Sequence, residues 1–299
     1  MAAKSDVSFS FGVNNAYIMR AGRHFAGSDD PPLPTELLRI LTDKSHPQYH
    51  ARMLDVALPL DDAGYYMLSW EATTGKSWLE RDAMGSAYPR LHSFMRFGTT
   101  YNTAFGPDRS FFSASPAGYA AQNLPPGLET GITESAATRH PVCVALGREG
   151  TYAVVYSNGS YAWQLALGGD SGSGKTLYPE LEKMFEKDAQ GESEAQRRKG
   201  LKYIALDPNS TTQFFALFND DSVWWDLPQA WFKDIEAALS GWRATRTSTP
   251  GPAADGATKS RKWHDLHAED VSEFVEGFKE GVEMVSNVLS IAGQMNGSG

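Results

Sequence analysis

The sequence predicts a mainly β protein whose five repeated units close into a propeller-like ring, followed by a C-terminal amphipathic helix. Three observations predict this fold: a pattern of three short strands and a helix recurs along the chain, Asn, Asp and Gly turns separate the strands, and a proline introduces each helix. A unit of this size cannot bury its own aromatic face and must pack against its neighbours. A closed antiparallel barrel of five hairpins with helices outside is the alternative architecture.

Two stretches show the repeat most clearly, "VCVALGREGTYAVVYSNGSYAWQLA" (142–166) and "KYIALDPNSTTQFFALFNDDSVWWDLP" (202–228). Each reads as an apolar strand, a turn, an aromatic strand, a second turn and a third strand. Asn158-Gly159 is a strong hairpin signal, because both residues tolerate positive φ. The predicted repeat domain covers residues 1–244, with units at about 7–41, 53–95, 101–132, 142–185 and 201–239.

Equivalent positions of the units align. The first strands end at Phe11, Leu58, Phe105, Leu146 and Leu206, and the second strands begin at the aromatic residues Tyr17, Tyr65, Phe111, Tyr152 and Phe214. The prolines that introduce the helices are Pro34, Pro89, Pro125, Pro179 and Pro228. Proline suits the first helical position, where its missing N–H removes no hydrogen bond.

Composition narrows the possible partners. The chain has 299 residues, 41% hydrophobic and 21% charged, which is typical of a globular protein. Its net charge of −9 argues against nucleic acid, because phosphate binding needs a basic surface. The sequence has neither a secretory signal nor an apolar run long enough to span a membrane, which favours the cytoplasm. The single cysteine, Cys143, is interpreted as a small core residue.

The C-terminal region is predicted to carry an interaction element. Residues 245–266 are rich in Pro, Gly, Ala, Ser and Thr and predict a flexible linker. Residues 267–295 predict an amphipathic helix. Its apolar face includes Phe274, Phe278, Val282, Val285 and Leu289. We expect this helix to dock on its own domain, to self-associate or to bind a protein partner, because it would be only marginally stable alone.

The stretch "GGDSGSGKT" (168–176) matches a phosphate-binding loop through Gly169, Gly174, Lys175 and Thr176. Such a loop needs a buried parallel strand before it and a helix that begins at the Lys-Thr pair. The repeat instead aligns the preceding strand with hairpin partners, and Pro179 predicts a later helix start. We therefore expect a variable loop here, with nucleotide binding as a subsidiary alternative.

No catalytic residues, metal site or cofactor are predicted. The seven histidines form no H-E-x-x-H motif, and "GDSG" (169–172) resembles a serine-protease motif over four residues only. Acidic pairs such as Asp61-Asp62 stand at turns, where Asp is favoured for its local hydrogen bonds.

The repeat, with its pattern "ALG..GTY.V.YSNGSY.W" before a proline and a short helix, resembles repeats in uncharacterised proteins of filamentous fungi. More distantly it resembles five-bladed lectin propellers of the tachylectin type. That resemblance implies similar pockets between blades, for sugars or other small ligands. The chain departs from the lectin pattern in having a helix where a fourth strand would be.

Three functions follow as hypotheses. The first is a non-catalytic binding or scaffold protein with an interaction helix. The second is a binder of glycans or small ligands, in which tryptophan faces stack on the ligand. The tryptophans predicted for this role are Trp70, Trp78, Trp163, Trp224 and Trp225. The third is an enzyme that uses the central pocket of the propeller, or a nucleotide hydrolase that uses Lys175 and Thr176.

Overall fold

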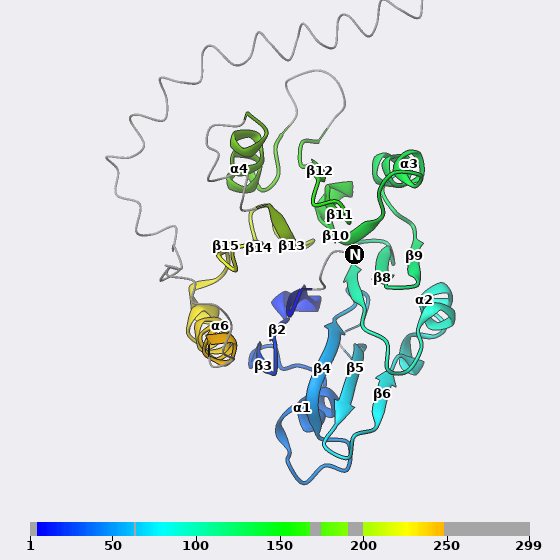
Figure 1. Ribbon diagram of the computed structural model, residues 1–299, viewed down its shortest axis with the longest axis vertical. Helices are drawn as coiled ribbons and strands as arrows, with labels where there is room; N and C mark the ends of the chain where they lie inside the picture. The colour runs from blue at the N-terminus through cyan, green and yellow to red at the C-terminus, as the bar shows by residue number, and fades with distance from the viewer. Residues whose placement is uncertain (1–4, 63, 168–174, 191–199, 248–299) are drawn as a thin grey trace, which may run out of the picture. The chain divides into compact units, whose positions relative to one another are not determined.

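The computed structural model describes residues 5–62, 64–167, 175–190 and 200–247 (Figure 1). The chain divides into two units, residues 1–260 and 261–299, and every described residue belongs to the first. The predicted C-terminal helix, with Phe274, Phe278, Val282, Val285 and Leu289, therefore lies outside the described residues. In the described part of the chain, no helix is long and apolar enough to cross a membrane.

The described chain is mainly β, as predicted, and forms five separate three-stranded antiparallel sheets in which the second strand is central (Figure 1). Sheet 1 contains β1 (Val7–Phe11), β2 (Tyr17–Ala21) and β3 (His24–Gly27), and sheet 2 contains β4 (His50–Ala57), β5 (Met67–Ala72) and β6 (Ser77–Glu80). Sheet 3 contains β7 (Asn102–Phe105), β8 (Phe111–Ser115) and β9 (Gly118–Gln122). Sheet 4 contains β10 (Pro141–Leu146), β11 (Tyr152–Tyr156) and β12 (Tyr161–Gln164), and sheet 5 contains β13 (Leu201–Leu206), β14 (Phe214–Phe218) and β15 (Val223–Asp226).

A helix follows each sheet. The helices are α1 (Thr35–Thr42), α2 (Pro89–Phe94), α3 (Pro126–Ser135), α4 (Pro179–Gln190) and α6 (Phe232–Thr247). Single-turn 3₁₀ segments lie at Val13–Asn15, Asp82–Met84, Arg148–Gly150 and Gln229–Trp231. Each aligned proline begins a helix or directly precedes one or its leading 3₁₀ turn, as predicted. Because α6 continues to Thr247, the first three residues of the predicted linker belong to this helix.

The strand register confirms the predicted alignment of first-strand ends and second-strand starts in four units and corrects it in one. The end of the first strand pairs with the start of the second at Phe11 and Tyr17, Phe105 and Phe111, Leu146 and Tyr152, and Leu206 and Phe214. In sheet 2 the corresponding pair is Ala57 and Met67, so Leu58 and Tyr65 lie outside the strands. The turn from Ala57 to Met67 is longer than the corresponding turns of the other sheets, so both aligned positions fall inside it.

The first strands of the sheets contact one another in the order β1, β4, β7, β10, β13 and β1 again. A side-chain hydrogen bond accompanies each junction between sheets. These bonds run from Leu58 N to Ser10 Oγ (2.9 Å), Ser69 Oγ to Thr99 O (3.0 Å), Asn102 Nδ2 to Val142 O (2.9 Å), Cys143 Sγ to Ile204 O (3.5 Å) and Tyr203 Oη to Phe9 O (2.6 Å). Sheet 5 is thus in direct contact with sheet 1.

The hydrophobic cores lie between consecutive sheets, with the intervening helix packed against both. Leu91 of α2 shares a core with Phe111 of sheet 3, and Leu128 of α3 shares one with Val154 of sheet 4. The same arrangement joins the last unit to the first, because the rings of Trp231 and Tyr17 stack with centroids 4.2 Å apart. Each unit therefore buries its aromatic face against a neighbour.

Cys143 is buried in β10, as the sequence predicted. Burial raises the pKa of its thiol to about 11, because a thiolate would lose its hydration there. The thiol is therefore protonated at neutral pH, and this makes it a poor nucleophile.

Candidate binding grooves

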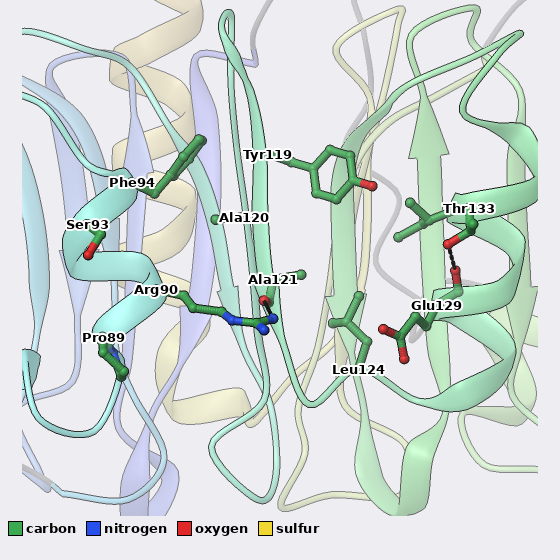
Figure 2. Close-up of a pocket in the computed structure, with 11 residues that line it drawn as sticks. Pro89, Arg90, Ser93, Phe94, Tyr119, Ala120, Ala121, Leu124, Glu129 and Thr133 are labelled. Atoms are coloured by element: carbon green, nitrogen blue, oxygen red, sulfur yellow. Dashed lines mark hydrogen bonds between the residues drawn. The ribbon is translucent and has the colours of Figure 1, made fainter.

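A groove lies over the outer strand of sheet 3, between the helix of the preceding unit, α2, and the helix of its own unit, α3 (Figure 2). We call it the β9 groove. It has a volume of about 720 Å³ and is lined by Pro89, Arg90, Ser93, Phe94, Tyr119, Ala120, Ala121, Leu124, Glu129, Ile132 and Thr133. The helix α2 is only six residues long, and β9 remains partly exposed beside it.

Tyr119 is the most exposed aromatic side chain of the β9 groove. Its ring stacks on Phe112, with centroids 5.5 Å apart and an interplanar angle of 23°. Nevertheless, 42% of the residue is exposed, and Figure 2 shows the ring extending from the strand toward α3. A ring held in this way by a buried neighbour offers a pre-positioned flat surface to a ligand.

Charged and polar groups flank this aromatic surface. On the α2 side, Arg90 Nη1 donates a hydrogen bond of 3.3 Å to the backbone oxygen of Ala121. On the α3 side, the hydroxyl of Thr133 donates to the backbone oxygen of Glu129 (2.8 Å), and the Glu129 side chain lines the groove. The groove therefore combines an exposed ring with a cation on one wall and a carboxylate on the other (Figure 2).

A second groove lies at the equivalent place of unit 1, over β3 and between α6 and α1. This β3 groove has a volume of about 520 Å³ and is lined by Arg23, His24, Phe25, Ala26, Gly27, Asp29, Leu41, Tyr49, His50, Asp234, Ala237 and Ala238. It contains more charged residues than the β9 groove. Burial lowers the pKa of His50, which favours its neutral form near pH 7.

The strand register places an aromatic residue at the same position of both grooves. Counting from the first residue of the central strand, its fourth residue pairs with Phe25 in sheet 1 and with Tyr119 in sheet 3. The corresponding residues of sheets 2, 4 and 5 are Trp78, Tyr161 and Val223. Four of the five units therefore carry an aromatic side chain at this point of the outer strand.

The five tryptophans predicted as ligand contacts pack mainly within the protein. Trp70 and Trp225 are buried, Trp70 donating its indole N–H to Gln48 O (2.9 Å) and Trp225 stacking on Phe215. Trp78, Trp163 and Trp224 are partly buried against the cores. None of the described residues that line the two grooves is one of these tryptophans. Their role in ligand binding stays a prediction.

The described part of the predicted phosphate loop has the geometry of a hairpin. Ala166 and Thr176 form an antiparallel bridge, and the backbone N–H of Leu167 donates to Lys175 O (3.0 Å). The helix begins at Pro179, beyond the Lys-Thr pair. A phosphate-binding loop would place Lys175 and Thr176 at the helix N-terminus. Gly169 and Gly174 lie outside the described residues.

Within the described residues, no group of three or more His, Cys, Asp or Glu side chains could hold a metal ion. No protein-family model, curated protein or solved structure matches the chain. The resemblance to fungal repeat proteins and to lectin propellers therefore stays a prediction.

Sequence reasoning missed Tyr119, Arg90 and Glu129. The pattern "GYAAQ" contained a usable signal, because counting pairs back from Phe111 places Tyr119 opposite Ala114 on an outer strand. Arg90 comes from α2 and Glu129 from α3, which belong to different units, so their proximity depends on how those units pack.

Proposed function

We propose that the five sheets close into a propeller-like ring and that the protein is a non-catalytic binding protein. The order of contacts among the first strands supports closure, since β13 is in contact with both β10 and β1. The stacking of Trp231 on Tyr17 supports it as well, because it joins the last unit to the first.

The proposed ligand is a glycan, bound in the grooves over the outer strands. The observation that carries this proposal is that two grooves occur at equivalent places of different units, each with an aromatic residue at the same register position. A sugar presents an apolar ring face with hydroxyl groups at its edge. Tyr119 supplies a flat apolar surface, and Arg90 and Glu129 supply a hydrogen-bond donor and acceptor beside it.

A glycan array probed with the full chain tests this function. We expect the wild type to bind a defined set of glycans, and Tyr119→Ala and Arg90→Ala to lose most of the signal. Phe97→Ala is the matched control, because Phe97 is 65% exposed and lies outside the groove lining. An array without binding, or equal binding by the wild type and both groove variants, would contradict the proposal.

The predicted interaction helix suggests an additional scaffold role. Deleting residues 248–299 should then change the oligomeric state or remove a protein partner, while the grooves and their glycans remain. Size-exclusion chromatography with light scattering would detect the first effect. The cytoplasmic location and the enzymatic alternatives remain predictions.

A further inference from the structure

A third cavity lies where the first strands of sheets 3, 4 and 5 begin, and it shares one lining residue, Tyr119, with the β9 groove. Asn102, Pro141, Val142 and Lys202 line it from these strand starts, and Ser5 lines it from the segment before β1. Its volume is about 390 Å³, within the range of roughly 300–1,000 Å³ that is typical of small-molecule sites. It is also more enclosed than the β9 groove.

The wall of this cavity is predominantly apolar and carries positive charge. Tyr101, Ala114, Pro141 and Val142 contribute apolar surface. The lining residues include two basic side chains, Lys202 and His140, and no carboxylate.

The ammonium group of Lys202 is held in place. Its Nζ lies 3.0 Å from Asp221 Oδ1, and its side chain is only 15% exposed. The other oxygen of Asp221 lies 2.7 Å from Arg246 Nη1, so one carboxylate is shared by two cations. An ammonium group has three N–H donors, and the contact with Asp221 engages one. An anion at Lys202 would therefore meet a positive and partly desolvated environment.

We propose that this cavity binds a small organic anion with an apolar body, the anionic group lying at Lys202. The apolar body would lie against Val142 and the exposed ring of Tyr119, and the hydroxyl groups of Ser5 and Ser157 would contact polar substituents. The site adjoins the β9 groove through Tyr119, but Lys202 lines neither groove, so the proposal does not depend on the glycan function.

Two fluorescent probes test the proposal. The first is 1-anilinonaphthalene-8-sulfonate, and the second is N-phenyl-1-naphthylamine, which has the same ring system without the sulfonate. Titrated into the full chain, the sulfonate should show saturable binding at one site and bind more tightly than the neutral probe. Absence of saturable sulfonate binding, or equal affinity for the two probes, would overturn the proposal.

Variants locate the site. Lys202→Met should weaken sulfonate binding by about tenfold or more and leave the neutral probe unchanged, because it removes the ammonium group, keeps an apolar side chain and leaves Asp221 paired with Arg246. Thr100 also lines the cavity, so Thr100→Trp should fill it and reduce binding of both probes. Arg90→Ala and Lys233→Met are the controls, for a cation of the β9 groove and for an exposed lysine of α6, and both should bind the sulfonate as the wild type does. A loss of sulfonate binding in Arg90→Ala, with Lys202→Met unaffected, would assign the probe to the groove and reject the cavity.

Discussion

The side-chain hydroxyl of Tyr203 donates a hydrogen bond of 2.6 Å to the backbone oxygen of Phe9 and accepts one of 2.9 Å from the backbone nitrogen of the same residue. Both residues are buried, and 194 positions of sequence separate them. The Tyr203 side chain of β13 thus satisfies both backbone hydrogen-bonding groups of Phe9, which lies in β1 of the neighbouring sheet. This pair joins the last sheet to the first.

Replacing Tyr203 by Phe should destabilise the protein. The ring remains, but the N–H and C=O of Phe9 lose their partner in a buried site, which costs about 1–3 kcal/mol. Urea unfolding followed by far-UV circular dichroism would measure the loss. Tyr119→Phe, at an exposed site, should leave the midpoint nearly unchanged. Equal stability of Tyr203→Phe and the wild type would show that this bond does not stabilise the junction.

Two glycine substitutions should have opposite effects on the stability of the protein. A Cβ on Gly106 would lie 2.6 Å from Leu146 Cβ on the next unit, whereas the nearest atom to a Cβ on Gly131 is Tyr156 Oη at 4.0 Å. Gly106→Ala should therefore cost about 1–3 kcal/mol through overpacking. Gly131→Ala, inside α3, should stabilise by about 0.5–1 kcal/mol, because alanine has the higher helix propensity. Thermal unfolding would compare them, and a tolerated Gly106→Ala would mean that the units pack less closely.

Asp207 should make stability depend on pH. Burial raises the pKa of its carboxyl from 3.8 to about 6, and the residue is 1% exposed. Since the folded protein binds this proton more tightly than the unfolded chain, the contribution of Asp207 favours folding at low pH. It becomes unfavourable as pH rises through about 4 to 6.

Asp207→Asn should remove this dependence and gain about 1–3 kcal/mol at pH 7. An asparagine can retain the acceptor that receives the Asn209 backbone N–H (2.9 Å). Unfolding measured from pH 4 to 7 should give a smaller loss of stability for this variant than for the wild type. Asp62→Asn, in an exposed turn, serves as the control and should follow the wild type. Parallel curves for Asp207→Asn and the wild type would contradict the prediction.

Calorimetric titration with Mg-ATP should give no binding heat for the wild type or for Lys175→Ala. The reason is local, since Lys175 and Thr176 lie in a hairpin and the helix begins later, at Pro179. Heat that disappears in Lys175→Ala would show that residues 168–176 bind phosphate despite this geometry.

The hairpins and helix starts could be predicted because their signals are local. Asn158-Gly159 and the aligned prolines act through backbone conformation. The strand pairs at Phe11, Phe105, Leu146 and Leu206 follow from the repeated order of apolar strand, turn and aromatic strand. Sheet 2 departs from the alignment because the turn between its first two strands is longer than in the other sheets, so Leu58 and Tyr65 fall inside that turn.

The grooves could not be predicted because they depend on packing between units. Sequence identifies an aromatic residue but not whether a neighbour covers its ring. Trp225 is stacked on Phe215 and buried, whereas Tyr119 stacks on Phe112 and remains partly exposed. The residues that face Tyr119 come from α2 and α3, whose separation is set by the arrangement of sheets 2 and 3.

The central claim is that sheet 5 closes on sheet 1, because the ring and the β3 groove both require it. Arg23 and Ser240 are exposed residues on either side of this junction, and a Cβ on the adjacent Gly241 would lie 2.7 Å from the ring of His24. Nitroxide labels on Arg23→Cys and Ser240→Cys would report their separation by electron paramagnetic resonance, with the buried Cys143 as the native thiol. A short, narrow distance distribution that disappears in urea is the predicted result. A long or broad distribution under native conditions would contradict closure.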